Sequence, residues 1–343
     1  MQTIRRAAAI LLAVLFLLAS CGKPQDGPVD TIKIGVSVYR QDDTFISLLV
    51  DHLNEYAKTY EQIKGVKLQL DFSYAQYNQS LQNDQIDGFL QKDYDVVLVN
   101  VVDRTAAGGL VDKAKTAQKP IIFFNREPVR EDLDRWRLAY YVGADAAESG
   151  ELEGRLLVDA YMDDPARLDR NGDGVLQYVM LEGDPGHQDS MIRTETSVRT
   201  LTQAGIRTEK LASSIANWQR VQASTKMLLW IEKFGSRIEA VIANNDDMAL
   251  GALDAYANTG VADLPAIVGI DGTPGGLQAV SDGRMLGTVY NDSSSQARHL
   301  IQLACQLAAG ESLESLPLTD SKYLLTPYIH ITSENAALYS DAE

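Results

Sequence analysis

The chain has 343 residues, of which 45% are hydrophobic and 23% charged, and its formal net charge is −16. This length suits one large domain or two of ordinary size, and the composition is that of a folded protein. Such an acidic chain repels phosphate backbones, so we expect no nucleic-acid partner and favour a small neutral ligand.

The first twenty residues have the features of a targeting segment. MQTIRR is basic, and the thirteen residues of AAAILLAVLFLLA, Ala7 to Ala19, are apolar. A membrane-spanning helix needs roughly twenty apolar residues, which disfavours the alternative of an anchor helix. LASC resembles a bacterial lipobox, which implies a signal peptide over residues 1–20, cleavage before Cys21 and lipid on that cysteine. Residues 21–30 are polar, contain proline and glycine, and are predicted to form a tether.

Cys305 is the one other cysteine in the sequence, and it lies in ARHLIQLACQLAAG on an apolar helical face. A free cysteine in that position behaves as a small hydrophobic residue, which we favour over a metal or catalytic role. With Cys21 lipidated, no disulfide is expected.

From Thr31 onward, strand and helix patterns alternate along the chain. Strand-like runs include IKIGVSV, VKLQLDFSY, DVVLVNV, PIIFFN, VLQYVMLEG, IEAVIAN, AIVGID and LGTVYND, with helical spacing between most of them. Such alternation predicts parallel sheets covered by helices on both faces. Some ten strands exceed what one sheet usually carries, so we predict an α/β fold of two doubly wound, Rossmann-like lobes. Ligands of such sheets bind outside the carboxyl ends of the strands.

Polar side chains follow many of these apolar runs: Asp42, Asp43, Asn125, His187, Asn244, Asn245, Asp271 and Asn291. Each one taken singly is explained by capping of the next helix. Together, and facing each other across a cleft, they would form a site of carboxamides and carboxylates. Such a site suits a ligand covered in hydroxyl groups, because a hydroxyl donates to a carboxylate and accepts from an amide.

The same segments carry a family resemblance. YRQDDTF, FFNREP, YYVGAD, EGDPGHQDSMIR, VIANNDDMALGA, VGIDGTP and GTVYND resemble the periplasmic D-galactose/D-glucose-binding proteins of bacterial ABC transporters, which have the periplasmic binding protein type I fold. The resemblance runs from about Ile32 to Leu338. It implies two lobes joined by a three-strand hinge, with 31–143 plus 292–326 in the N-terminal lobe and 144–291 plus 327–343 in the C-terminal lobe.

The resemblance also implies a set of sugar contacts: Asp43, Phe45, Asn125, His187, Asp189, Arg193, Trp218, Asn245, Asp271 and Asn291. Phe45 and Trp218 would sandwich the pyranose, since aromatic planes pack on the apolar faces of a sugar. The alternative for Trp218 is ordinary packing before a helix. Asp43 would read the 4-hydroxyl, where glucose and galactose differ, and its carboxylate accepts from either epimer.

Asp189 and Arg193 lie four residues apart on a predicted helix and therefore share one face. A surface ion pair would explain that spacing too, but their place directly after His187 favours side chains that reach into the cleft. We interpret His187 as a neutral donor to a hydroxyl, because no nucleophile or paired catalytic acid accompanies it.

DRNGDGVLQ, Asp169 to Gln177, matches the front half of a calcium loop. Met180 stands where an EF-hand has its glutamate and a strand follows, which excludes an EF-hand. The resemblance implies a structural Ca²⁺ held by Asp169, Asn171, Asp173, Val175, Gln177 and the distant Glu239. The alternative is a polar turn without a metal.

The function that these patterns favour is a lipid-anchored substrate-binding protein that faces the periplasm or exterior. It would capture D-glucose or D-galactose as a monomer and deliver it to the permease of an ABC importer. A sensor that presents its closed form to a chemoreceptor or kinase remains open. A sugar-processing enzyme is less favoured for want of a catalytic constellation, and a repressor for want of a helix-turn-helix.

Overall fold

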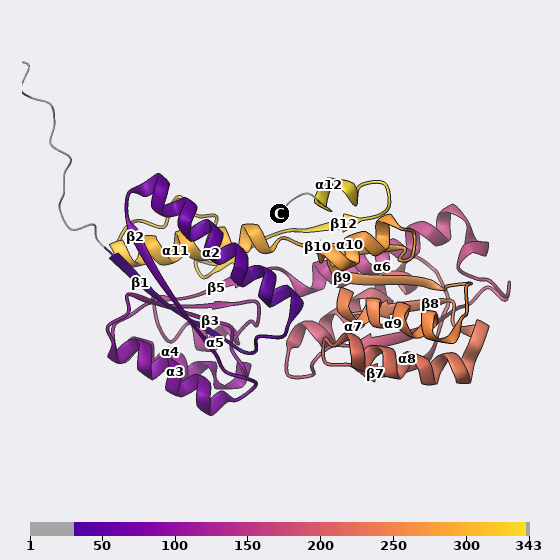
Figure 1. Ribbon diagram of the computed structural model, residues 1–343, viewed down its shortest axis with the longest axis horizontal. Coiled ribbons are helices and arrows are strands. Elements are labelled where there is room, and N and C mark those ends of the chain that lie inside the picture. The colour runs from indigo at the N-terminus through magenta and orange to yellow at the C-terminus, as the bar shows by residue number, and fades with distance from the viewer. Residues whose placement is uncertain (1–30, 341–343) are drawn as a thin grey trace, which may run out of the picture.

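A computed structural model of the chain describes residues 31–340, which form two α/β lobes side by side (Figure 1). The predicted signal peptide, Cys21 and the tether lie outside the described residues. Within the described part of the chain, no helix is both long and apolar enough to cross a membrane.

The first lobe contains a six-stranded sheet in the order β11-β5-β4-β3-β1-β2, and all of its strand pairs are parallel. Its strands are β1 (Thr31–Val38), β2 (Lys67–Tyr74), β3 (Val96–Val99), β4 (Ile121–Phe124), β5 (Ala139–Gly143) and β11 (Tyr323–Leu325). Its helices are α2 (Thr44–Lys64), α3 (Gln79–Gln91), α4 (Ala107–Thr116), α5 (Arg130–Leu133) and α11 (Ser293–Ala309), with a 3-10 turn, η1 (Arg104–Ala106).

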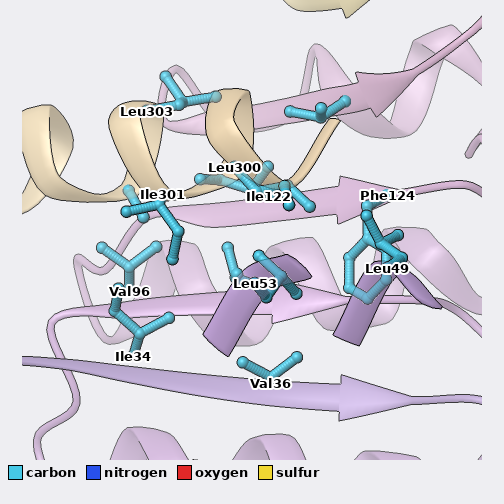
Figure 2. Close-up of a cluster of buried hydrophobic side chains, with 14 of the residues drawn as sticks. Ile34, Val36, Leu49, Leu53, Val96, Ile122, Phe124, Leu300, Ile301 and Leu303 are labelled. Atoms are coloured by element: carbon cyan, nitrogen blue, oxygen red, sulfur yellow. The ribbon is translucent and has the colours of Figure 1, made fainter. Parts of the chain in front are cut away.

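Helices cover both faces of this sheet, as the alternating pattern predicts. Successive residues of a strand point to opposite faces, so Val96 and Leu98 pack in the cluster under α2 and α11, while Val97 and Val99 pack in the one under α3 and α4. Figure 2 shows the first cluster, where side chains of α2 and α11 meet those of the central strands. Cys305 is buried in that cluster, and burial raises the pKa of its thiol to about 12, which leaves no reactive thiolate.

The second lobe contains a six-stranded sheet in the order β12-β10-β9-β8-β6-β7. Its strands are β6 (Leu176–Glu182), β7 (Thr208–Ile215), β8 (Ala240–Ala243), β9 (Ala266–Asp271), β10 (Gly287–Asn291) and β12 (Tyr328–Ile331). Its helices are α6 (Ala146–Asp163), α7 (Gln188–Gln203), α8 (Arg220–Phe234), α9 (Asp246–Thr259), α10 (Pro274–Ser281) and α12 (Ala337–Ser340), with 3-10 turns η2 (Pro165–Arg167) and η3 (Gly235–Arg237). Side chains of α6 and α7 cover one face, and those of α8, α9 and α10 cover the other.

The chain passes between the sheets after Gly143, after Asn291 and again between Leu325 and Tyr328. The last passage reverses one strand, because β12 pairs antiparallel with β10. The predicted parallel pairing therefore holds for every named strand pair except β10–β12. The physical reason is the short link between β11 and β12. The chain continues without turning back as it enters the second lobe, so β12 lies beside β10 in the opposite direction.

Candidate functional site

A cavity lies between the two lobes, at the ends of strands from both sheets. The cavity is narrow, and the centre of a water-sized group can move through only about 20 Å³ of it. Its lining residues are Tyr39, Asp43, Phe45, Ile46, Asn125, His187, Arg193, Trp218, Asn245 and Asp271. Of the ten predicted sugar contacts, Asp189 and Asn291 are absent from this lining, and each contacts a residue that belongs to it.

Asp43 is both a helix cap and a cavity residue. One carboxylate oxygen, Oδ1, accepts from the backbone N–H of Ile46 at 3.0 Å, which caps α2. The other, Oδ2, accepts from the hydroxyl of Tyr39 at 2.5 Å. Capping and ligand contact therefore do not compete here, since each oxygen has more than one acceptor position. Tyr39 was not predicted as a site residue, because it follows directly on an apolar strand and reads as core.

Asn125 follows β4 with a left-handed backbone, φ +60°. Its carbonyl accepts from the hydroxyl of Tyr141 at 3.0 Å, and its side-chain Oδ1 accepts from Nδ2 of Asn100 at 3.0 Å. These bonds fix the amide and leave its Nδ2 free to donate to a ligand. Phe45 is buried at the start of α2 on the same side of the cavity.

Polar atoms on the opposite wall are buried without a hydrogen bond. Neither Nε1 of Trp218 nor Nε2 of His187 makes one within the described residues, although Nε2 of His187 lies 3.4 Å from Oδ1 of Asp189. A native protein satisfies nearly all such buried atoms. The two rings meet edge to face, with their centroids 5.5 Å apart. Gly183 permits this packing, because a Cβ there would lie 2.1 Å from the indole Cη2. Burial, helped by Arg126 and Arg193, holds the pKa of His187 well below its usual value, so the imidazole is neutral.

Arg193 is the buried cation of the second lobe. Its Nη1 donates to the carbonyl of Asn244 at 2.9 Å, and its Nη2 donates to the hydroxyl of Tyr328 at 3.0 Å and to Asp189 at 3.4 Å. Asp271 lies 3.9 Å away. Burial alone would lower the pKa of Arg193, but Tyr328, Asp189 and Asp271 outweigh it and raise the value. Asp189 and Arg193 are 5% and 4% exposed, which excludes a surface ion pair.

Asn245 and Asp271 complete the second wall. Oδ1 of Asn245 accepts from the N–H of Met248 at 3.0 Å and caps α9, so its Nδ2 remains for a ligand. Asp271 ends β9 with φ +117°, and Nδ2 of Asn291 lies 3.5 Å from its Oδ1. Burial holds the pKa of Asp271 well above its usual value, which makes a neutral hydroxyl a better partner for it than a second anion.

The predicted calcium loop is hydrogen-bonded to Glu239. The two carboxylate oxygens of Glu239 accept backbone N–H groups of the loop, from Arg170 at 2.7 Å and from Gln177 at 2.9 Å. Glu239 is fully buried and forms no ion pair with any described lysine or arginine. Three backbone N–H groups, those of Arg170, Asn171 and Gln177, satisfy this buried carboxylate, so its burial alone does not require a cation.

Oxygen is the only ligand type that this loop offers. Asn171 donates to Gln177 at 2.8 Å and Gln177 donates to Asp173 at 2.9 Å, which gathers the polar side chains of the loop. Over residues 31–340 there is no group of three His, Cys, Asp or Glu side chains placed to hold a metal. A cation here would therefore depend on amide and carbonyl oxygens as well, as a hard ion such as Ca²⁺ accepts.

Comparison with known proteins shows the family to which this chain belongs. Residues 34–312 match the family described as periplasmic binding protein domain. The chain belongs to the periplasmic binding protein family. Its two lobes and sheets are those of type I members, which confirms the predicted fold class. The D-galactose/methyl-galactoside binding periplasmic protein of Haemophilus influenzae is 37% identical over 96% of this chain and 98% of that protein. The xylitol-binding protein of Mycolicibacterium smegmatis is 31% identical over 91% and 82%.

Solved structures agree with this family. An ABC transporter solute binding protein from Bacillus halodurans, with bound myo-inositol, is 30% identical and has a TM-score of 0.75 over 92% of this chain and all of that one. A periplasmic solute binding protein from Actinobacillus succinogenes, with bound D-allose, shares the fold with a TM-score of 0.76 at 22% identity. As a periplasmic binding protein, the chain acts outside the cytoplasm, and its named relatives are binding proteins rather than enzymes.

We expect Asp246 to make the stability of this periplasmic binding protein depend on pH. It is fully buried, and burial raises its pKa to about 7 although Thr288 and Thr273 donate hydrogen bonds to it. The folded state therefore favours the protonated acid, and this contribution is lost as the pH rises through 7. Between about pH 6 and pH 8 we expect a loss of about 1.4 kcal/mol in unfolding free energy.

Urea unfolding at both pH values measures that loss. The Asp246→Asn variant should show a smaller fall than the unchanged protein, while the exposed control Asp282→Asn should match it. An equal fall in all three proteins would contradict the assignment to Asp246.

Proposed function

We propose that this protein captures D-glucose or D-galactose in the cleft between its lobes and delivers the sugar to an ABC importer. The observation that carries the proposal is a cavity with aromatic side chains on opposite lobes, Phe45 and Trp218, and with buried polar atoms that lack protein partners. Aromatic planes suit the apolar faces of a pyranose, and its hydroxyls would satisfy the unpartnered groups.

The neighbouring polar groups include both hydrogen-bond donors and acceptors, which suits a polyol ligand. Asn125, Asn245 and the neutral His187 offer N–H groups, whereas Asp43 and Asp271 offer oxygens. A hexose hydroxyl can engage one of each kind. Relatives are named for galactosides and xylitol, and a related structure holds myo-inositol, so the choice among polyols rests on these individual contacts. We propose that Asp43 recognises the 4-hydroxyl, since its carboxylate can accept a hydrogen bond from that hydroxyl in either epimer.

Two further properties belong to the proposal. A Ca²⁺ ion in the loop of Asp169, Asn171, Asp173, Val175 and Gln177, with Glu239 beneath, would stabilise the second lobe without touching the sugar. Lipid on Cys21 would hold the protein at a membrane, so that a loaded protein stays near its permease.

Equilibrium dialysis against radiolabelled glucose, galactose, xylose and ribose tests capture. We expect retention of about one mole of glucose or galactose per mole of protein, with weaker retention of the pentoses, whose smaller rings leave part of the site unpaired. Chromatography of the retained sugar should recover it unchanged. Retention of none of the four sugars would overturn the proposal, and a converted sugar would point to an enzyme.

A further inference from the structure

We propose that Arg126 is a positioning residue that couples closure of the cleft to the placement of ligand groups on both lobes. The inference rests on the proposed function, and it concerns a side chain outside the cavity lining. Arg126 follows Asn125 at the end of β4 and is 3% exposed.

Arg126 is fixed within its own lobe by two contacts. Its Nη1 donates to the carbonyl of Val102 at 3.1 Å, and its guanidinium lies 4.0 Å from the ring centroid of Tyr39. Tyr39 in turn donates to Asp43, the proposed reader of the sugar 4-hydroxyl. A guanidinium over an aromatic face is attracted to it, so Arg126 fixes the ring that orients Asp43.

The other end of Arg126 reaches the opposite lobe. Its Nη2 donates to Oδ2 of Asp184 at 2.7 Å. Asp184 also organises the turn that carries His187, because its Oδ1 accepts from the N–H of Gly186 at 2.8 Å and its carbonyl accepts from the N–H of His187 at 3.0 Å. One ion pair therefore connects Asp43 on the first lobe with His187 on the second.

This ion pair differs from the other contacts across the cleft. Thr44 donates to Asp247 at 2.5 Å and Gln188 donates to Glu127 at 2.6 Å, and both of these donors are neutral. Within the described residues, Arg126–Asp184 is the one ion pair that joins the two lobes. Opening the cleft would leave the buried guanidinium with no carboxylate, whereas Arg40 would keep Asp42 and Asp43 of its own lobe.

The Arg126–Asp184 ion pair would stabilise the closed state. A contact present only when the lobes are closed favours that state and slows release of the sugar, and it leaves the first encounter with the open cleft largely unchanged. Because Asp184 is mostly buried and Arg126 almost wholly so, solvent and salt screen the attraction only in part.

A double-mutant cycle on galactose dissociation tests the proposal. Stopped-flow fluorescence would measure association and dissociation rates for Asp184→Asn, Arg126→Gln and the double variant. Asp112→Asn serves as a matched control, because Asp112 pairs with Arg135 at 2.9 Å within the first lobe. Asp184→Asn keeps the acceptor for Gly186, so the ligand-free melting temperature should stay that of the unchanged protein.

We expect each single variant to dissociate about 10- to 100-fold faster with association changed by less than about threefold. The double variant should be no worse than the more affected single variant, and Asp112→Asn should match the unchanged protein. Dissociation of Asp184→Asn within about twofold of the unchanged protein, or effects that multiply in the double variant, would overturn the coupling. Failure of the unchanged protein to bind either hexose would instead overturn the proposed function itself.

Discussion

Replacing Arg193 by methionine is expected to abolish hexose binding and to lower the unfolding free energy by about 3–5 kcal/mol. The guanidinium lies 3.4 Å from Asp189 and 3.9 Å from Asp271, and all three side chains are buried. Its removal leaves two buried carboxylates without their cation. Urea unfolding measures the stability, and titration calorimetry measures the binding.

A second variant separates the two effects. Arg193→Met combined with Asp271→Asn removes one of the uncompensated charges, so it should recover part of the lost stability while binding stays abolished. A single variant that binds hexose within about tenfold of the unchanged protein would contradict the role of Arg193 in the site.

Removing calcium is expected to lower the melting temperature of the second lobe by on the order of 10 °C. Ligand at a thousandfold excess over its dissociation constant stabilises a folded state by about 4.1 kcal/mol, and a lobe of this size shifts by a few degrees per kcal/mol. Calorimetric melts with calcium and with EDTA give the difference. In Glu239→Gln this difference should shrink markedly, because one of the three carboxylates proposed to hold the ion is gone.

The calcium-dependent shift, rather than the absolute melting temperature, is the informative quantity. Glu239 also accepts backbone N–H groups, so its loss lowers stability even without a metal. Asp282→Asn, an exposed carboxylate outside the loop, should keep the full shift. An unchanged melt of the natural chain in EDTA would show that the loop needs no cation.

The two lobes could be predicted from the sequence, because the order of strand and helix patterns along the chain determines this kind of fold. Buried runs such as IIFF of β4 and AVIA of β8 alternate with helical spacing, and a parallel sheet covered on both faces follows from that alternation. The helical, buried position of Cys305 is confirmed in the same way. The direction of β12 was not predictable, because it depends on how the second lobe meets the chain that leaves β11.

Some residues of the candidate site could likewise be predicted from the sequence, and others could not. Asp43 and Asn245 could be found from sequence, since each stands between a strand and the next helix, which it caps. Tyr39 could not, because it follows an apolar strand directly and has the pattern of a core residue. Arg126 could not, because its partner Asp184 lies on the other lobe. A short polar stretch such as EGDPGH signals a turn, but no local pattern reports which side chain faces it across a cleft.

Isothermal titration calorimetry of the protein with D-glucose and D-galactose tests the central claim most directly. The account predicts one site per chain for at least one of these hexoses, with binding lost in Trp218→Ala and kept in Trp230→Ala, whose indole packs against the core away from the cavity. Heat changes no larger than dilution for both sugars, or binding that survives the loss of Trp218 undiminished, would contradict it.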